Sequence, residues 1–375
     1  MRTLLAWAML CGVTAASSPA QAGDGWAQFR GPNSSGVSTA EQSLPVEFSA
    51  TENVHWKVDL GDGVGCPVVK NGRVYVSAMD GEQAVALLCF DVASGKQLWK
   101  RSFHLDELPN IHRVNSYAST TPAVDDERVY FYSATLGMMA FDAKTGADVW
   151  RTPLPKPFFV FVWGAAMSPV LHDGRLLFVQ DDDLNPALYS FDTATGKILW
   201  KDDRSDMAVN YSHPVIVQTD RGDEIVVAGT GKLIGYDPET GKRLWYARVL
   251  LRNIKTTPSA SGDRVYISLQ SGGIANQWLA TADKNSDGKL TRDEIRASTE
   301  GNPVPESFFA KFDRGDVNKD GFLEGEELDK AFLHPDNFAG ARYDADDPAE
   351  SWVMAVRGGG SGDVTDTHVL WREES

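Results

Sequence analysis

The chain has 375 residues and a formal net charge of −16 at pH 7, from 52 acidic and 36 basic side chains. This acidic balance argues against nucleic acid or an anionic membrane surface as a partner, because both carry the same sign of charge. The length is sufficient for one large core or for two domains.

Residues 1–22 have the features of a secretory signal peptide. Arg2 supplies an early positive charge, an apolar run covers 4–16, and Ala20-Gln21-Ala22 forms a small-residue cleavage site. The apolar run is too short for a transmembrane helix, and no later segment predicts a membrane span. We therefore expect export to the periplasm or the cell surface, with a signal that stays as an anchor as the alternative.

Two cysteines follow the predicted cleavage site, Cys66 and Cys89. They are too few to hold together a fold of this size by disulfides. We expect them on strands two apart in one sheet, roughly 9.5 Å from each other. A disulfide needs Cα atoms within about 7 Å, so the prediction is two buried thiols.

A repeat with the pattern [FY]-D-x-x-[TS]-G-x-x-[LV]-W occurs at 90–99, 141–150, 191–200 and 236–245. An Asp that accepts hydrogen bonds starts each predicted turn, and a Gly supplies the positive φ that closes it. An apolar strand precedes each turn and a strand with a Trp follows, which indicates a hairpin. A period of this length indicates a repeat architecture.

Each unit has two earlier strands, the first of which begins near a proline, at Pro67, Pro122, Pro169, Pro214 and Pro258. Four short antiparallel strands in each unit predict the blades of a β-propeller. The repeated Trp residues, with Trp56 and Trp371 added, are expected to pack between blades as core.

Trp56 has no preceding strands of its own. We therefore expect residues 54–58 to form an outermost strand that completes another blade. The fifth unit ends with strands at 352–356 and 368–371, and 362–366 replaces its Asp-x-x-Thr-Gly turn. We expect the chain to be a fragment or an open, partial propeller.

Two twelve-residue segments, 283–294 and 316–327, match D-x-[DN]-x-[DN]-G-x5-E at every fixed position. Calcium prefers six to eight oxygen ligands, which this spacing provides. Two Ca²⁺ sites are predicted, with Lys289 and Phe322 contributing carbonyl oxygens. The predicted ligands are Asp283, Asn285, Asp287, Lys289 and Glu294 in the first loop, and Asp316, Asn318, Asp320, Phe322 and Glu327 in the second. A metal-free loop or an acidic turn is the alternative.

Helical patterns flank these loops, at 306–312 and 328–332, whereas the helix expected around 277–281 is short. Leu290 and Leu323, at position 8 of each loop, are expected to pair as a short strand. Residues 275–335 resemble the EF-hand family; dockerin modules, the near alternative, carry Asp at position 12. We expect tighter binding at the second loop, because Glu324 adds negative charge there while Lys289 and Arg292 oppose it in the first. Chelation is expected to disorder 275–340 and to leave the blade Trp environments intact.

The repeat and the leader Trp26-Ala27-Gln28-Phe29-Arg30-Gly31-Pro32-Asn33-Ser34-Ser35-Gly36 resemble the PQQ-type, quinoprotein-like propellers. This resemblance implies either a PQQ-dependent dehydrogenase or a scaffold like the propeller of the outer-membrane assembly machinery. The chain lacks the adjacent Cys pair of many PQQ alcohol dehydrogenases. Candidates to line a central funnel are Asp181, Asp182, Asp183, His112, Asn115 and Tyr117, against their interpretation as solvated loop residues.

The predicted fold is mostly β: a PQQ-like β-propeller of about five four-stranded blades with a small helical pair inserted in the fifth. The predicted boundaries are 1–22 for the signal peptide, 23–272 for the blades, 273–350 for the insertion and 351–375 for the rest of the fifth blade. Exposed hairpin tips tolerate such insertions.

The sequence therefore favours an exported, calcium-binding propeller that acts as a binding or assembly scaffold rather than as an enzyme. Its expected partners are proteins or a cell-envelope component. A PQQ-dependent alcohol or sugar oxidoreductase is the alternative, with catalytic and cofactor-binding residues unassigned.

Overall fold

The fold is described from a computed structural model. The structure describes residues 25–38, 45–160, 162–207, 209–248, 256–271, 274–299, 303–332 and 350–374. The predicted signal peptide lies outside these residues. Within them, no helix has the length and apolar character needed to cross a membrane.

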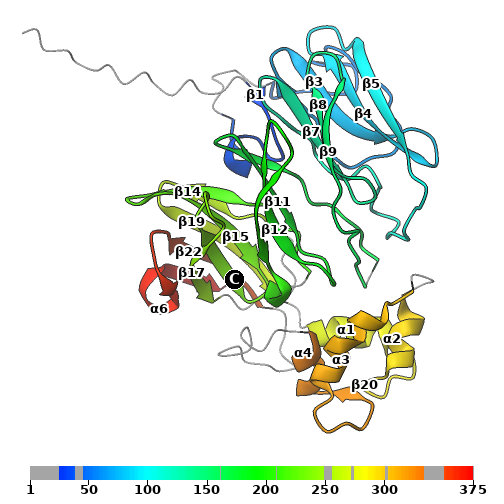
Figure 1. The fold of residues 1–375 in the computed structure, drawn as a ribbon, viewed down its shortest axis with the longest axis vertical. Helices are drawn as coiled ribbons and strands as arrows, with labels where there is room; N and C mark the ends of the chain where they lie inside the picture. Colours follow the sequence, from blue (N-terminus) through cyan, green and yellow to red (C-terminus); the bar gives the residue numbers. More distant parts are fainter. Residues whose placement is uncertain are drawn as a thin grey trace, which may run out of the picture.

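Five antiparallel sheets of four strands each follow one another along the chain, as predicted (Figure 1). Blade 1 contains β2 (Val68–Lys70), β3 (Arg73–Met79), β4 (Ala84–Asp91) and β5 (Gln97–His104), with β1 (Gly25–Trp26) added at the edge beside β2. Blade 2 contains β6 (Ala123–Val124), β7 (Arg128–Ser133), β8 (Gly137–Asp142) and β9 (Asp148–Thr152). Blade 3 contains β10 (Val170–His172), β11 (Arg175–Gln180), β12 (Ala187–Asp192) and β13 (Ile198–Asp203).

Blade 4 contains β14 (Val215–Thr219), β15 (Gly222–Gly229), β16 (Lys232–Tyr236) and β17 (Arg243–Arg248). Blade 5 contains β18 (Ser259–Ser261), β19 (Arg264–Ser271), β22 (Glu350–Arg357) and β24 (Val369–Glu374). The segment that replaces the fifth turn forms β23 (Gly362–Asp363), which pairs in parallel with β17, and the short helix α6 (Thr365–His368). Two 3-10 turns complete the propeller, η1 (Pro32–Ser34) and η2 (Ser205–Met207).

The core lies between successive blades. Val129 and Phe131 pack toward blade 1, whereas their neighbours Tyr130 and Tyr132 pack toward blade 3. The same alternation recurs between blades 3 and 4 and between blades 4 and 5. Because successive side chains of a strand point to opposite faces, a strand buried on both faces is apolar throughout, as these strands are.

The blades are joined by a Trp that lies on the Gly of the next blade's turn. The indole N–H of Trp150 donates to the Thr193 carbonyl at 2.9 Å, and a Cβ on Gly196 would lie 2.5 Å from the ring. Glycine is therefore required at position 196 for two reasons: the backbone has a positive φ of 71°, and the ring leaves no space for a Cβ. Equivalent pairs are Trp99 with Gly146 and Trp200 with Gly241. The predicted packing of these Trp residues between blades is confirmed.

Trp56 makes the same contact on Gly95 and donates to the Val92 carbonyl at 2.8 Å, but residues 54–60 form no strand. The predicted strand is wrong because no strand of the described residues pairs with this segment. Trp245 instead donates to Glu224, since β23 stands in place of the next turn. Trp371 is 41% exposed, so its prediction as core is wrong in the described structure.

Both cysteines are free, as expected. Cys89 is buried on β4, but Cys66 precedes β2 and is only half-buried. The prediction that Cys66 is a buried thiol on a strand is therefore wrong.

In blades 2 to 5, the residue before the inner-strand proline accepts a backbone hydrogen bond from the preceding blade. Thr121 Oγ1 accepts from Cys66 N at 2.9 Å, Ser168 Oγ from Thr121 N at 3.1 Å, and His213 Nε2 from Ser168 N at 3.0 Å. Thr257 Oγ1 accepts in turn from His213 N at 3.3 Å. These contacts connect the inner ends of all five blades.

The leader, residues 25–36, crosses the inner edges of the same blades. After β1 pairs with blade 1, the Ala27 carbonyl accepts from Val124 N and Gln28 Oε1 accepts from Leu171 N, both at 2.8 Å. The Phe29 ring stacks on His213 with centroids 4.3 Å apart. The Asn33 amide forms two hydrogen bonds with the Ile216 backbone, and Arg30 donates to the Thr257 carbonyl. Residues 25–30 thus contact the five blades in order, and Asn33 returns to blade 4.

Between β19 and β22, which pair with each other, the chain forms a helical module at one end of the molecule (Figure 1). Its elements are α1 (Ile274–Ala282), β20 (Lys289–Leu290), α2 (Arg292–Ser298), η3 (Glu306–Phe308), α3 (Phe309–Gly315), β21 (Leu323–Glu324) and α4 (Glu326–Phe332). The first helix, expected to be short, has nine residues.

Replacing Gly196 by Ala is expected to displace the Trp150 ring. Overpacking of this kind costs about 1–3 kcal/mol. Gly174→Ala is the matched control, because Gly174 has a φ of 70° but a Cβ added there would meet no atom within 4 Å. Urea unfolding followed by Trp fluorescence should show a larger loss of stability for Gly196→Ala. Equal losses would mean that the ring contact contributes nothing.

His213 is expected to make the fold acid-sensitive. Burial lowers the pKa of this imidazole from 6.5 to about 3, so the unfolded chain gains a proton at a pH where the folded chain does not. Stability should therefore fall as the pH drops below about 6.5, by up to about 1.4 kcal/mol per pH unit. His213→Thr, which supplies the kind of hydroxyl acceptor that blades 2, 3 and 5 use, should remove this part of the slope. The measurement is urea unfolding at about pH 7.5 and about pH 5.5; parallel slopes in both proteins would contradict the assignment.

Candidate metal centre

The helical module places the two predicted metal loops side by side. Each loop runs from the end of one helix to the start of the next, and β20 pairs with β21 between them. The expected pairing of Leu290 with Leu323 is confirmed, and both side chains are fully buried. Lys289 of the first loop forms a 2.7 Å ion pair with Glu324 of the second. The two loops therefore form one unit.

In the first loop, the Asp283 carboxylate accepts from Gly288 N at 2.9 Å and from Asp287 N at 3.2 Å. Asn285 Oδ1 also accepts from Asp287 N, and Asp287 Oδ1 accepts from Lys289 N. The loop backbone turns at Gly288, whose φ is 77°. These hydrogen bonds turn the side-chain oxygens of positions 1, 3 and 5 toward the inside of the loop.

Glu294 has a different role in the first loop. Its Oε2 accepts from Thr291 N and Thr291 Oγ1, while Thr291 Oγ1 accepts from Glu294 N, which is a capping box at the start of α2. The carboxylate of position 12 is therefore engaged at the helix start, and Arg292 beside it pairs with Asp313.

The second loop repeats the turn, with Asp316 accepting from Asp320 N and Gly321 N, Asn318 Oδ1 from Asp320 N, and Asp320 Oδ1 from Phe322 N. Glu327, however, reaches across the loop. Its Oε1 accepts from Val317 N at 3.2 Å and from Asn318 N at 3.4 Å, and its Oε2 is buried without a hydrogen-bond partner. A buried carboxylate oxygen without a partner costs free energy unless a cation or water satisfies it.

The donor set of the second loop fits a hard cation such as calcium, because it consists of carboxylate, amide and carbonyl oxygens without Cys or His. Across the parts of the chain that the structure describes, no group of three or more His, Cys, Asp or Glu side chains has a metal-binding arrangement. The loop carboxylates accept from amides of their own loop, and Glu294 caps a helix.

The helical module packs on the propeller, which the sequence did not indicate. Its core of Trp278, Phe308 and other apolar side chains includes Val160, with Phe158 and Leu184 at its edge. The rings of Phe158 and Phe308 meet edge to face at 6.2 Å. Lys311 forms a 3.1 Å ion pair with Asp183, whose side chain is 7% exposed. Only the aromatic stripe over 308–312 could have suggested a second packing partner.

The three aspartates 181–183 are buried, so their interpretation as solvated loop residues is wrong. Asp181 forms a fully buried ion pair with Arg204, with Nη2 and Oδ2 2.8 Å apart. Asp182 accepts from the amides of Leu184 and Asn185 and from Gln180. The charge of Asp181 is therefore satisfied by a guanidinium and that of Asp182 by backbone and side-chain donors, whereas Asp183 pairs with Lys311 of the helical module.

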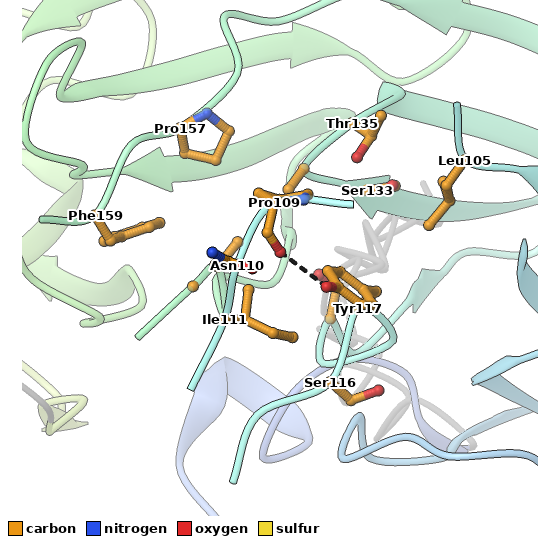
Figure 2. A pocket seen from close by; sticks show the side chains of 14 residues that line it. Leu105, Pro109, Asn110, Ile111, Ser116, Tyr117, Ser133, Thr135, Pro157 and Phe159 are labelled. Carbon is orange, nitrogen blue, oxygen red and sulfur yellow. Dashed lines mark hydrogen bonds between the residues drawn. The ribbon is translucent and has the colours of Figure 1, made fainter. Parts of the chain in front are cut away.

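Of the other funnel candidates, Tyr117 lines a cavity of about 40 Å³ (Figure 2), and His112 and Asn115 are chain neighbours of its lining residues Ile111 and Ser116. Tyr117 donates to the Pro109 carbonyl at 2.8 Å. The His112 ring lies 4.5 Å from that of Trp163, and Asn115 donates to the Trp163 carbonyl. Pro157 and Phe159 form the opposite wall in Figure 2. A cavity of this size has room for a few water molecules.

The sheets and their repeat define a mostly-β propeller with a helical insertion, and the comparisons name its family. A model of PQQ-like repeats, described as outer membrane protein assembly factor BamB, matches residues 34–121 and 88–323. These matches cover more than half of the chain, which therefore belongs to this family.

Curated relatives include both an enzyme and an assembly factor. The chain is 27% identical over 249 residues to quinohemoprotein alcohol dehydrogenase ADH IIB of Pseudomonas putida, covering 58% of this chain and 33% of that protein. It is 22% identical over 255 residues to outer membrane protein assembly factor BamB of Shewanella oneidensis, covering 63% of this chain and 61% of that protein. The chain thus spans from about a third to three fifths of the length of these relatives.

Two solved structures are also similar. BamB from Moraxella catarrhalis has a TM-score of 0.36 at 17% identity, with 54% of this chain and 53% of that chain covered. A europium-containing methanol dehydrogenase has a TM-score of 0.42 at 13% identity, with 60% of this chain and 48% of that chain covered.

Proposed function

We propose that the protein is an exported β-propeller scaffold that binds two calcium ions in an EF-hand pair. The observation that carries the calcium proposal is Glu327, which reaches across the second loop with one buried oxygen that has no partner. A cation at the centre of the loop would satisfy this oxygen together with Asp316, Asn318, Asp320 and the Phe322 carbonyl.

The first loop would hold its ion with Asp283, Asn285, Asp287, the Lys289 carbonyl and Glu294. Glu294 must first give up its capping contact with Thr291. Lys289 pairs with Glu324, so the extra charge of the second loop is partly neutralised by the first. The order of affinities, second loop above first, then depends chiefly on how far each Glu is already turned toward its loop.

A scaffold role is supported by family membership and by the identity with an outer membrane protein assembly factor. The corresponding partners would be proteins or other components of the cell envelope, met after export to the periplasm or the cell surface. Extracellular calcium modules work at about 10⁻⁴–10⁻³ M, so a constitutive structural ion suits an exported protein.

A PQQ-dependent alcohol or sugar oxidoreductase remains the second candidate, favoured by the identity with the Pseudomonas putida enzyme. Incubation of the protein with PQQ and calcium, followed by absorbance and dye-linked oxidation of alcohols or sugars, separates the two. Stoichiometric PQQ binding with turnover would replace the scaffold proposal.

Calcium titration of the purified protein by calorimetry is expected to show two sites of unequal affinity. Glu327→Gln should abolish the tighter site and Glu294→Gln the weaker one, because each removes a bidentate carboxylate from position 12. Glu326→Gln, at the exposed neighbour of Glu327, is the matched control and should change little. A greater loss from Glu294→Gln would reverse the order of the sites, and no heat of binding in the parent protein would refute calcium binding.

A further inference from the structure

The segment Pro157–Val160 lies between the helical module and the cavity of Figure 2, and its side chains alternate between them. Phe158 and Val160 pack in the core of the module, whereas Pro157 and Phe159 line the cavity. A shift of this segment therefore changes both surfaces at once.

The segment is tied to blade 3 by the same aspartate that holds the module. Asp183 Oδ2 accepts from Val160 N at 2.9 Å, and Asp183 N donates to the Phe158 carbonyl at 2.9 Å. The other carboxylate oxygen, Oδ1, forms the ion pair with Lys311. Asp183 thus joins the cavity wall to α3 through one side chain.

Helix α3 in turn reaches the second calcium loop. Phe308 and Lys311 contact the propeller near its start, and its last turn leads directly into Asp316, whose amide donates to the Phe312 carbonyl. At its far end α3 crosses α4 closely, since a Cβ on Gly315 would lie 2.5 Å from that of Ala331. Glu327 belongs to α4. Helix α3, with seven residues and a length of about 10 Å, connects the contact with the propeller to the second loop.

We propose that calcium in the second loop is coupled through α3, Lys311 and Asp183 to the cavity wall formed by 157–160. Calcium fixes α3 against α4 through Asp316 and Glu327, which holds Phe308 and Lys311 on the propeller and orders the wall. This inference rests on the proposed calcium binding and adds a control of the cavity wall, which carries both apolar and hydroxyl-bearing side chains. The cavity lining includes Ser116, Tyr117, Ser133, Thr135, Pro157 and Phe159.

Coupling between two sites is reciprocal, so weakening the contact with the propeller must weaken calcium binding. Phe158→Ala and Lys311→Gln, neither of which changes a predicted ligand, should each lower the affinity of the second loop about fivefold or more. For Lys311→Gln, the direction of the change in calcium affinity distinguishes coupling from a simple charge effect. Removing a positive charge near a cation site would by itself raise calcium affinity, as we expect for the control Lys319→Gln, an exposed residue within the loop.

Hydrogen exchange supplies a second readout in the full chain. Calcium should slow exchange of the Val160 and Asp183 amides in the parent protein, and this protection should be lost in Glu327→Gln and in Phe158→Ala. Exchange in the blade 4 strand β16 serves as the internal reference, because none of its residues belongs to the apolar core that the module shares with the propeller.

The outcomes separate the coupling from the calcium proposal. If calcium binds the parent protein but Phe158→Ala and Lys311→Gln keep or raise the affinity, with exchange at 157–160 independent of calcium, the coupling is refuted and calcium binding stands. If the parent protein binds no calcium, both are refuted. Reduced affinity in both variants, together with calcium-dependent exchange at 157–160, supports the coupling.

Discussion

The contact between a Trp of one blade and the turn of the next is the interaction on which the propeller depends. It combines a ring lying on a glycine with an indole N–H bonded to a turn carbonyl, and it recurs from Trp56 to Trp200. An Asp and a Gly make the turn that receives the ring, so the repeat pattern is the signature of the contact. The apolar cores between blades then fill the space that these contacts enclose.

The centre of the propeller is organised by polar contacts. Because proline has no N–H, the residue before it supplies the last backbone donor, and a side chain of the next blade accepts it. The leader adds further contacts along the inner strands of all five blades. At Ile216, the Asn33 side chain bonds to both the N–H and the carbonyl, as a neighbouring strand would. The buried imidazole of His213 takes part both in the contacts between blades, by accepting from Ser168 N, and in the contacts with the leader, by stacking on Phe29.

The sequence predicted what is periodic and local. The blades, the Asp and Gly turns, the Trp positions and the Leu290–Leu323 pairing follow from spacing and turn chemistry. The missed features join residues far apart in the chain: the leader across the inner strands, Asp183 with Lys311, and the burial of Asp181 beside Arg204. An Asp-Asp-Asp run in a connecting loop gives no sign of the arginine that will neutralise it. The different orientations of Glu294 and Glu327 also depend on neighbours that the shared motif does not encode.

The Trp contacts have a direction, because Trp99, Trp150 and Trp200 each lie on the turn Gly of the blade that follows. Each turn is thus part of its predecessor's interface, although it belongs to another repeat. A substitution of the turn Gly, or of the Trp that lies on it, would therefore disturb two repeats rather than one. The fifth blade illustrates this dependence: where its turn has been replaced by β23, the preceding Trp245 has found a different partner in Glu224.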